Sequence, residues 1–344
     1  MAKNDSMTGI VLETSASCQL NCPNCFLRSY DERPQPALMG PEVVRAVAPY
    51  LAGMDSLDLT GWGEPLLNPD LFEIIETVKD AFSGKITMTT NGLLLDREKM
   101  ERIIALGLDT VCVSVDASSE SRYRAARKGG DFKILHRVLD EFATLRDGSG
   151  KERPLLFGTY LLRKDALSDL DEFVGLVSAH GFDGVVFQQM TGIFSKDGLE
   201  QATHSAYYYN DFDSDRLDRA VGAAKKVAPP GFTIVGPERV AAKRVCDCGG
   251  FDITRPFVTA PGDVSVCCAM AYPCSLMRRD RSIEKTAAIT FGNVLEKPLP
   301  EIWEDPEYVK AREEIRSGEV PQACGDCIAL YISPGEVWTA PEED

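Results

Sequence analysis

Between residue 8 and about residue 190, the chain alternates between short β-rich runs and longer helical runs. The β-rich runs, which predict strands, are Ile10 to Thr14, Ser56 to Thr60, Lys85 to Thr90, Thr110 to Val115, Leu155 to Leu162 and Val185 to Met190. The runs between them predict helices at Pro41 to Leu51, Pro69 to Ala81, Asp96 to Leu106, Asp131 to Leu145 and Leu167 to His180. Strands and helices that alternate in this order predict a parallel sheet with helices outside it. We therefore expect an α/β fold in which six strands form an open or partial barrel.

Three cysteines, Cys18, Cys22 and Cys25, lie within eight residues, closely after the first predicted strand. They are too close together for a disulfide framework to use them all, so the spacing suggests a metal site. Structural zinc and a [4Fe–4S] cluster both need four ligands, yet the next cysteine is Cys112 and the first histidine is His136. Three protein ligands would leave one metal position open for another molecule. A zinc site completed from a distance is the alternative.

Polar or flexible residues follow the next three strands. In βα barrels, chemistry is built at the carboxyl ends of strands because loops and backbone groups converge there. The second strand leads into Thr60-Gly61-Trp62-Gly63-Glu64-Pro65, where glycines let backbone approach a ligand and a carboxylate lies beside them. The third ends at Asn91-Gly92, and the fourth contains Ser114-Val115-Asp116. Small polar side chains there can form hydrogen bonds with a ligand, although ordinary turn chemistry also explains Asn91-Gly92.

The cysteines resume late in the chain with a different spacing. Cys246 and Cys248 precede a predicted hairpin, Pro256 to Ala260 and Val264 to Cys268, which turns at Pro261-Gly262-Asp263. A predicted helix that ends near Ile315 then leads to the pair Cys324 and Cys327. These thiols are enough for a second four-ligand site, and zinc is an alternative occupant.

The spacing C-x3-C-x2-C resembles the signature of the radical S-adenosylmethionine (SAM) enzymes. In that family the three cysteines hold a [4Fe–4S] cluster whose fourth iron binds the amino and carboxylate groups of SAM. Electron transfer then cleaves SAM to methionine and a 5′-deoxyadenosyl radical, which abstracts hydrogen from substrate. The family's Gly-Gly-Glu-Pro motif has Trp62 in place of its first glycine here, and Asn24 stands where an aromatic residue commonly packs by the adenine. The resemblance also implies a partial (β/α)6 TIM-like barrel.

The same resemblance implies roles for individual residues on the SAM side of the site. Glu64 is the expected partner of the SAM ammonium group, and Arg127 offers a planar fork for the SAM carboxylate. The alternative is that Arg127 belongs to a solvent-exposed basic turn and binds no ligand. The expected SAM-binding residues are Gly61, Gly63, Glu64, Asn91, Ser114, Asp116 and Arg127.

The C-terminal region resembles the auxiliary-cluster extension known as SPASM. Both have, in this order, a first cysteine, the motif Gly-x4-Cys, a helical segment with Asn-Val-x-Glu and Glu-Ile-Trp, and the motif C-x2-C. No cysteine follows Cys327, so the chain resembles the truncated form called twitch, a small α+β domain with one auxiliary [4Fe–4S] cluster. The implied ligands are Cys248, Cys267, Cys324 and Cys327, with Cys246 as an alternative to Cys248.

These features predict a division of the chain into domains. We expect a radical SAM core at residues 8–190, a bridge with a helix at 191–240, the auxiliary cluster domain at 241–330 and a tail at 331–344. The length of 344 residues suits two domains.

Charge and composition narrow the expected partners. The formal charge of −16, without a run of Lys and Arg, argues against nucleic acid. No apolar run approaches membrane-spanning length, and residues 1–8 do not resemble a signal peptide, so we expect a cytoplasmic protein. In that reducing compartment the 11 cysteines are expected as ligands or free thiols. An external electron donor of the flavodoxin or ferredoxin kind is also implied by the resemblance.

For the substrate, we expect a small polar molecule such as a sugar or aminocyclitol of natural-product biosynthesis. The first cysteines begin only 18 residues into the chain, which predicts no preceding peptide-recognition domain; peptide modification is the second hypothesis. Oxidation of an alcohol, with the auxiliary cluster as electron acceptor, is the expected reaction. Epimerisation with a hydrogen-donating thiol, Cys268 or Cys274, is the alternative, and a free cysteine of this kind is more often simply buried. An iron–sulfur electron carrier or zinc-stabilised binding module is the non-enzymatic alternative.

Overall fold

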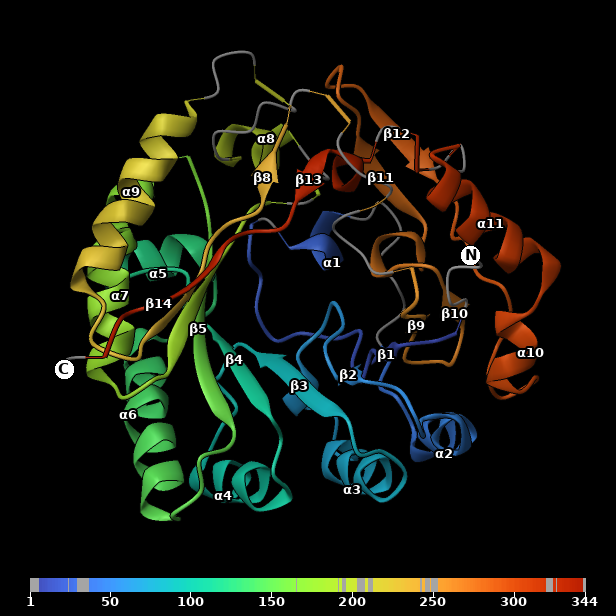
Figure 1. Ribbon diagram of the computed structural model, residues 1–344, viewed down its shortest axis with the longest axis horizontal. Coiled ribbons are helices and arrows are strands. Elements are labelled where there is room, and N and C mark those ends of the chain that lie inside the picture. Colours follow the sequence, from blue (N-terminus) through green and yellow to red (C-terminus); the bar gives the residue numbers. More distant parts are fainter. Residues whose placement is uncertain are drawn as a thin grey trace.

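A central sheet of ten strands organises the computed structural model, in the order β10-β9-β1-β2-β3-β4-β5-β6-β7-β14 among the described residues (Figure 1). The structure describes residues 6–23, 25–29, 37–164, 166–190, 192–193, 196–202, 208–209, 213–241, 243–244, 248, 253–319, 324–325 and 327–342. Neighbouring strands from β1 to β7 are parallel: β1 (Gly9–Leu12), β2 (Ser56–Asp58), β3 (Lys85–Thr90), β4 (Thr110–Ser114), β5 (Leu155–Leu161), β6 (Gly184–Gln188) and β7 (Thr233–Val235). The predicted α/β fold with a parallel sheet is therefore confirmed.

The sheet is wider than the six expected strands because segments from outside the predicted core join both of its ends. At one end β9 (Phe257–Val258) pairs parallel with β1, and β10 (Val264–Ser265) pairs antiparallel with β9, which confirms the predicted hairpin. At the other end β7 and β14 (Val337–Thr339) follow β6. These strands come from the expected bridge, cluster domain and tail, so one sheet runs through all four expected segments. The domain division itself stays a prediction.

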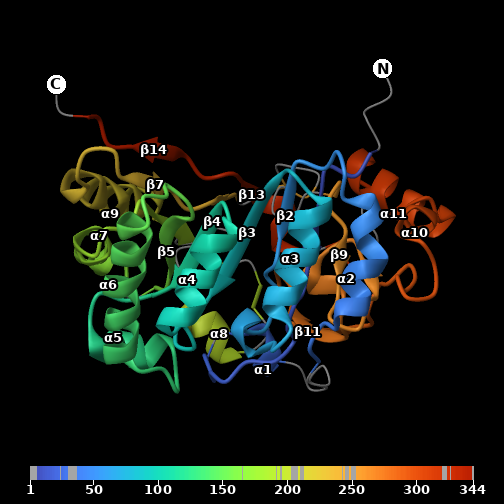
Figure 2. The same ribbon diagram turned by 90° about the horizontal axis from the view of Figure 1, so that it is seen from below.

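Helices cover the outer face of the sheet (Figures 1 and 2). They are α2 (Pro41–Val47), α3 (Leu71–Ala81), α4 (Arg97–Leu106), α5 (Glu120–Ala126), α6 (Phe132–Gly148), α7 (Leu170–Ala179) and α9 (Ser214–Val227). Local signals set their bounds: the Asp96 and Asp131 side chains accept backbone N–H bonds at the starts of α4 and α6. Gly107, at φ 67°, ends α4. The α2 helix is shorter than predicted and continues as a 3₁₀ turn over Ala48–Tyr50, because Pro49 lacks the N–H that would extend it.

The described residues form further helices and short strands. They are α1 (Phe26–Ser29), α8 (Lys196–Gln201), β8 (Arg239–Val240), β11 (Cys274–Met277), β12 (Ile283–Thr286), α10 (Leu299–Trp303), α11 (Pro306–Ser317) and β13 (Ile332–Ser333). Strands β11 and β12 form an antiparallel hairpin, and β13 pairs with β8. No helix among the described residues is long and apolar enough to cross a membrane.

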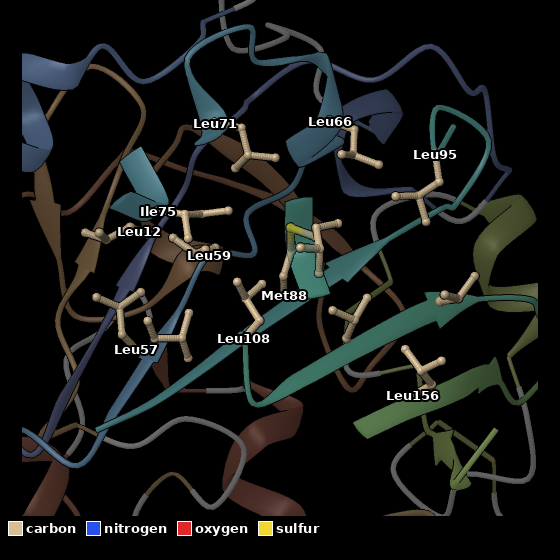
Figure 3. Close-up of a cluster of buried hydrophobic side chains, with 14 of the residues drawn as sticks. Leu12, Leu57, Leu59, Leu66, Leu71, Ile75, Met88, Leu95, Leu108 and Leu156 are labelled. Carbon is tan, nitrogen blue, oxygen red and sulfur yellow. The ribbon is translucent and has the colours of Figure 1, made fainter. Parts of the chain in front are cut away.

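The two faces of the strands differ in character. Side chains that point toward the helices are aliphatic and fully buried, as Leu57, Ile86 and Leu156 are, and they belong to one core cluster. Figure 3 labels Leu57 and Leu156 in this cluster. Their strand neighbours Asp58 and Thr87 point the opposite way, since side chains alternate across a strand. The interior of a closed TIM barrel is filled by bulky apolar side chains. Here polar side chains face inward, which leaves room for a ligand.

Candidate active site

The cysteine loop that follows β1 is held by backbone hydrogen bonds to neighbouring loops. Gly63 N donates to Ser15 O at 3.0 Å, and Glu64 N donates to Ser17 O at 2.7 Å. On the other side, Asn21 N donates to Lys128 O at 2.8 Å. The motif after β2 and the loop after α5 therefore position the three thiols.

Gly61 and Gly63 are required by close packing within the chain. A Cβ at Gly63 would lie 2.4 Å from Ser15 O, and a Cβ at Gly61 would lie 2.1 Å from Glu13 Cγ. Larger residues would displace the cysteine loop or the strand before it. Both glycines also line the cavity that the thiols face, so their expected approach to SAM stays a prediction.

The thiols of Cys18, Cys22 and Cys25 line one open cavity of about 900 Å³. We call it the SAM cavity. The structure brings every expected SAM-binding residue to it: Gly61, Gly63, Glu64, Asn91, Ser114, Asp116 and Arg127. No fourth thiol and no imidazole appears among its described lining residues. Three thiols beside an open cavity fit a [4Fe–4S] cluster that keeps one iron for SAM. Asn24 lies outside the described residues.

Glu64 is buried, with 2% of its surface exposed, and its carboxylate already has three donors. The Thr90 hydroxyl donates to Oε1 at 2.6 Å, Leu66 N donates to Oε1 at 3.1 Å, and Asn91 N donates to Oε2 at 2.7 Å. Burial raises the pKa of Glu64, while these hydrogen bonds oppose the rise. Glu64 thus ties the end of β2 to the end of β3, and its expected contact with the SAM ammonium would add to these bonds.

The Asn91 side chain contacts the cysteine loop. Its amide oxygen accepts a hydrogen bond from Gln19 Nε2 at 3.1 Å, and its amide nitrogen lies 3.8 Å from Cys18 Sγ. Ser114 is buried at the end of β4 and lines the same cavity. Gln19 was not anticipated from the sequence, because a polar residue between two cysteines carries no distinctive signal.

Asp116 and Arg127 form an ion pair at the edge of the SAM cavity. Asp116 adopts a left-handed conformation, at φ 59°, and its other carboxylate oxygen accepts a hydrogen bond from Leu161 N at 2.6 Å. Burial lowers the pKa of Arg127, but Asp116, Cys22 and Tyr123 together oppose burial and raise the pKa. Arg127 Nη1 also lies 4.0 Å from Cys22 Sγ. The Arg127 guanidinium, which we expect to bind the SAM carboxylate, is thus already paired with the Asp116 carboxylate. A SAM carboxylate bound there would share the guanidinium with Asp116.

Four thiols from separate segments line a second, more enclosed cavity of about 420 Å³. They belong to Cys248, Cys267, Cys324 and Cys327, the four expected auxiliary ligands, and we call this the auxiliary cavity. Its other walls are apolar, formed by Ile253, Val266, Met270, Ile315, Ala329 and Leu330. Burial, followed by the neighbouring thiols, raises the pKa of Cys267 well above its usual value and the pKa of Cys324 to about 12. Cys246 lies outside the described residues.

The arrangement of the thiols bears on the zinc alternative. Zinc needs its ligands gathered about one ion, with Zn–S distances of about 2.3 Å. Among the described residues, no three His, Cys, Asp or Glu side chains are grouped closely enough to hold a single metal ion. Each set of thiols lines a cavity, an arrangement that fits the iron–sulfur clusters expected from the sequence.

A third cavity, of about 1050 Å³, lies inside the barrel and was not anticipated. We call it the lumen cavity, and its polar or charged lining residues are Asp58, Thr60, Thr89, Gln188 and Arg255. It shares Thr60, Gly61, Trp62 and Thr89 with the SAM cavity, and Val266 and Cys267 with the auxiliary cavity. The alternation of Ser56, Asp58 and Thr60 with Leu57 and Leu59 was the sequence signal that could have revealed a polar interior.

Trp62 links the two cysteine regions. Its ring stacks on Phe26, which directly follows Cys25, with centroids 3.8 Å apart. Its indole N–H donates to Cys268 O at 3.0 Å, next to Cys267. The residue that departs from the family motif is thus the one that connects the loops of both thiol sites.

The two expected hydrogen-donor thiols lie in different surroundings. Cys268 lines the lumen cavity, and burial raises its pKa to about 12. Cys274 is buried in β11, 3.1 Å from Thr286 Oγ1, and is not among the described lining residues of any of the three cavities. Of the two, the structure brings only Cys268 to the interior of the barrel.

Glu13 is a further buried residue that the sequence did not single out. Its carboxylate accepts hydrogen bonds from Trp62 N at 3.0 Å, from Ala260 N at 3.3 Å and from the Tyr272 hydroxyl. Burial raises the pKa of Glu13, and these donors oppose the rise. Glu13 therefore joins the motif after β2 to two segments of the C-terminal region.

Comparison with known proteins agrees with this geometry. A family model of the radical SAM superfamily matches residues 12–177, and a model of the SPASM iron–sulfur cluster-binding domain matches residues 248–328. A probable GTP 3′,8-cyclase of Methanococcus maripaludis is 31% identical over 131 residues, covering 38% of this chain and 43% of the relative. The chain thus spans less than half the length of that curated relative.

Other similarities extend over nearly the whole chain. The AdoMet-dependent heme synthase of Methanosarcina barkeri is 26% identical over 341 residues, covering 95% of this chain and 90% of the relative. SuiB of Streptococcus suis, solved with S-adenosylmethionine and with the precursor peptide SuiA, shares the fold. Its SAM complex gives a TM-score of 0.64 at 17% identity and covers 96% of this chain and 72% of SuiB. The chain belongs to the radical SAM superfamily, carries a C-terminal SPASM region, and has SAM, its [4Fe–4S] cluster and an auxiliary iron–sulfur cluster as cofactors.

Proposed function

We propose that the protein cleaves SAM, abstracts hydrogen from a small polar substrate in the lumen cavity, and oxidises an alcohol of that substrate to a carbonyl. One observation carries this proposal: the lumen cavity shares lining residues with both thiol cavities. A substrate held there would lie beside SAM on one side and beside the auxiliary ligand Cys267 on the other.

The electrons balance over the reaction. Cys18, Cys22 and Cys25 would hold the [4Fe–4S] cluster, which would supply the electron for SAM cleavage, and the resulting radical would take a hydrogen atom from a carbinol carbon of the substrate. That carbon radical then loses one electron and the hydroxyl proton to form the carbonyl. An auxiliary cluster held by Cys248, Cys267, Cys324 and Cys327 would accept that electron. An external donor, which we expect to be flavodoxin- or ferredoxin-like, provides the first electron.

The lining of the lumen cavity supports a polar substrate. Thr60, Thr89 and Gln188 offer hydroxyl and amide groups, and Asp58 and Arg255 add one charge of each sign. Two relatives are named for chemistry on small molecules, GTP and heme. A sugar or aminocyclitol of natural-product biosynthesis fits such a lining, because each hydroxyl can pair with one of these groups. Peptide modification is the alternative, supported by the fold shared with SuiB.

Epimerisation is a second candidate reaction, favoured by the position of Cys268. Its thiol is on the wall of the lumen cavity and could return a hydrogen atom to the face opposite the one attacked, after which one electron from the external donor and one proton would restore the thiol. Cys274 has no such position. Epimerisation would involve no net oxidation of the substrate.

The first experiment tests SAM cleavage. Anaerobically purified protein with both clusters, reduced with dithionite and given SAM, should form 5′-deoxyadenosine and methionine. The Cys22→Ala variant should form neither, because one thiolate of the SAM cavity is missing. Absence of 5′-deoxyadenosine from the fully loaded wild-type protein would contradict the proposal and favour an electron carrier or a binding module.

The second experiment separates oxidation from epimerisation. The reaction is run in deuterated water once a substrate is in hand, and the product is analysed by mass spectrometry and NMR. A carbonyl product, two hydrogens lighter than the substrate, supports oxidation. Deuterium at an inverted carbon, abolished in the Cys268→Ala variant, would replace oxidation by epimerisation.

A further inference from the structure

The lumen cavity contains two charged side chains, Asp58 and Arg255, that the proposed reaction does not use. Asp58 lies on β2, where it pairs in register with Val11 and Thr87. Arg255 precedes β9, the strand that joins β1 from the C-terminal region. The two charges come from segments nearly 200 residues apart and meet the same interior space.

The carboxylate of Asp58 is already satisfied by the protein. Thr60 N donates to Asp58 Oδ1 at 2.9 Å, and the hydroxyls of Thr60 and Thr87 also hydrogen-bond to this carboxylate. Thr60 Oγ1 itself accepts a hydrogen bond from Thr89 N at 2.9 Å, which leaves its proton free for Asp58. The acidic group therefore does not require a ligand.

The guanidinium of Arg255 is less completely satisfied. Its charge interacts favourably with that of Asp58, but its Nε is buried and has no hydrogen-bond acceptor, and none of the ion pairs within 4.0 Å among the described residues includes Arg255. Buried donors without acceptors are rare in native proteins, so each one calls for a specific explanation. A cation with an unpaired buried Nε donor on a cavity wall is explained most simply by an anionic ligand, because the planar guanidinium fits carboxylate and phosphate groups.

The net charge of the whole chain bears on how an anion could be held near Arg255. With a formal charge of −16, the protein as a whole repels anions. An anionic molecule that enters the barrel must therefore be held by a local positive group. Arg255 lines the lumen cavity beside the amino end of β1, where a Cβ at Gly9 would lie 3.1 Å from its Nε, whereas the cysteine loop follows the carboxyl end of β1.

We propose that Arg255 binds an anionic group, a carboxylate or a phosphate, on the substrate that occupies the lumen cavity. The substrate class is thus an acidic small molecule, such as a sugar acid or a sugar phosphate, with the anion at Arg255 and the reacting carbon toward Trp62 and the SAM cavity. That the bound anion is the substrate rests on the proposed function. That the ligand is anionic rests on the geometry of the lumen cavity.

The test measures anion binding to the protein with both clusters and SAM bound. Inorganic phosphate and acetate serve as probes in calorimetry, with glycerol as a neutral control. In the Arg255→Gln variant the affinity for the preferred anion should fall at least about tenfold, since a charge-assisted pair is lost. The anion affinity of the Arg255→Lys variant should lie between those of wild type and Arg255→Gln, because an ammonium group cannot form the bidentate contact. Arg97→Gln, which removes an exposed arginine on α4, should bind like wild type.

A thermal measurement keeps the inference testable if Arg255→Gln folds poorly. In Arg255→Met the unpaired Nε donor is absent, and the favourable interaction of the Arg255 charge with Asp58 is lost as well, so we expect an unfolding temperature close to that of wild type without anion. It should also lose the rise in unfolding temperature that phosphate or acetate gives to wild type. The probe that binds more tightly, phosphate or acetate, indicates whether the anionic group of the substrate is a phosphate ester or a carboxylate.

The outcomes separate this inference from the proposed function. Equal anion binding by wild type and the Arg255 variants, or no binding by wild type, would overturn the role of Arg255 even if 5′-deoxyadenosine is formed. Wild-type protein that binds an anion through Arg255 but forms no 5′-deoxyadenosine would contradict the proposed function alone.

Discussion

The SAM cavity and the auxiliary cavity are both lined by thiols, yet they are built in opposite ways. The SAM cavity takes its three thiols from one loop of eight residues, is open, and has polar walls held by hydrogen bonds to Glu64 and Asp116. The auxiliary cavity takes four thiols from three segments, is smaller, and has apolar walls.

This difference matches the two expected tasks. A cofactor that is consumed and replaced at every turnover needs an open site with hydrogen-bonding groups for its polar atoms. A cluster that only accepts electrons is better enclosed, because apolar walls exclude solvent and tune its potential. The hydrogen-bonded cavity should therefore be sensitive to the loss of polar groups, and the apolar cavity to the loss of packing.

The largest expected effect follows from removing two thiols of the auxiliary cavity, which should abolish one cluster and leave the other. The double variant Cys324→Ala and Cys327→Ala should lose the auxiliary cluster and about four irons per chain, because two thiolates cannot hold it. Its SAM cavity is untouched, so it should still form 5′-deoxyadenosine but not the oxidised product. Iron analysis and electron paramagnetic resonance measure this, and Cys112→Ala serves as a control thiol in β4. Loss of both clusters would show that the cavities are not independent.

The second prediction concerns the polar cavity. Glu64→Ala removes the acceptor for Thr90, Leu66 and Asn91, which leaves buried donors unpaired. We expect the free energy of unfolding to fall by about 3 kcal/mol, measured by urea denaturation. The affinity for SAM should fall as well, since the loop ends that Glu64 joins form the cavity wall.

Leu330→Ala is the matched change in the apolar cavity. Leu330 is 2% exposed, and its truncation should cost about 2–4 kcal/mol through the space it leaves. Iron analysis should show loss of auxiliary cluster with Leu330→Ala and retention of it with Glu64→Ala. The reverse pattern, or equal loss in both variants, would contradict the division into a hydrogen-bonded and a packed site.

The third prediction concerns the protein without clusters. Burial raises the pKa of Cys324 to about 12 and the pKa of Cys267 well above its usual value. Thiols of the unfolded chain titrate near about 8.5, so above this pH the unfolded state loses protons that the folded state keeps. The free energy of unfolding should therefore fall as pH rises above about 8.5, by about 1.4 kcal/mol for each such thiol at about pH 9.5.

Urea denaturation of cluster-free protein at about pH 7.5 and 9.5 measures this fall. The double variant Cys267→Ser and Cys324→Ser should show a fall smaller by roughly 3 kcal/mol, since two thiols no longer titrate. Protein with bound clusters should lose little stability over the same range, because thiolate ligands do not take up protons there. An unchanged pH dependence in the double variant would rule out these two thiols as its source.

The smallest expected effect concerns the contact between the two regions. Trp62→Phe retains a ring beside Phe26 but removes the N–H donor to Cys268 O. We expect a loss of about 1 kcal/mol of stability, together with a changed resonance signal of the auxiliary cluster. Trp338→Phe on β14 is the control, and its cluster signals should match wild type. An unaltered auxiliary signal in Trp62→Phe would show that the hydrogen bond does not couple the two sites.

Local signals in the sequence determined the elements and the ligand loops. The bounds of β3 are as predicted, and α4 begins one residue after its predicted start, because strand alternation and helix caps depend only on near neighbours. The spacing of Cys18, Cys22 and Cys25 likewise indicated the family, since all three residues lie on one loop. The pair Cys324 and Cys327 did the same for the auxiliary site.

Only the tertiary structure decided how distant segments meet. Pairing of β9 with β1 brings Arg255 into the barrel, and no periodicity near Arg255 predicts that. The partner of Arg127 and the contact between Trp62 and Cys268 are equally non-local. Such contacts depend on the closure of loops that span up to hundreds of residues, which leaves no trace in local propensity or spacing. The cavity that joins the two thiol sites exists only once those segments have come together.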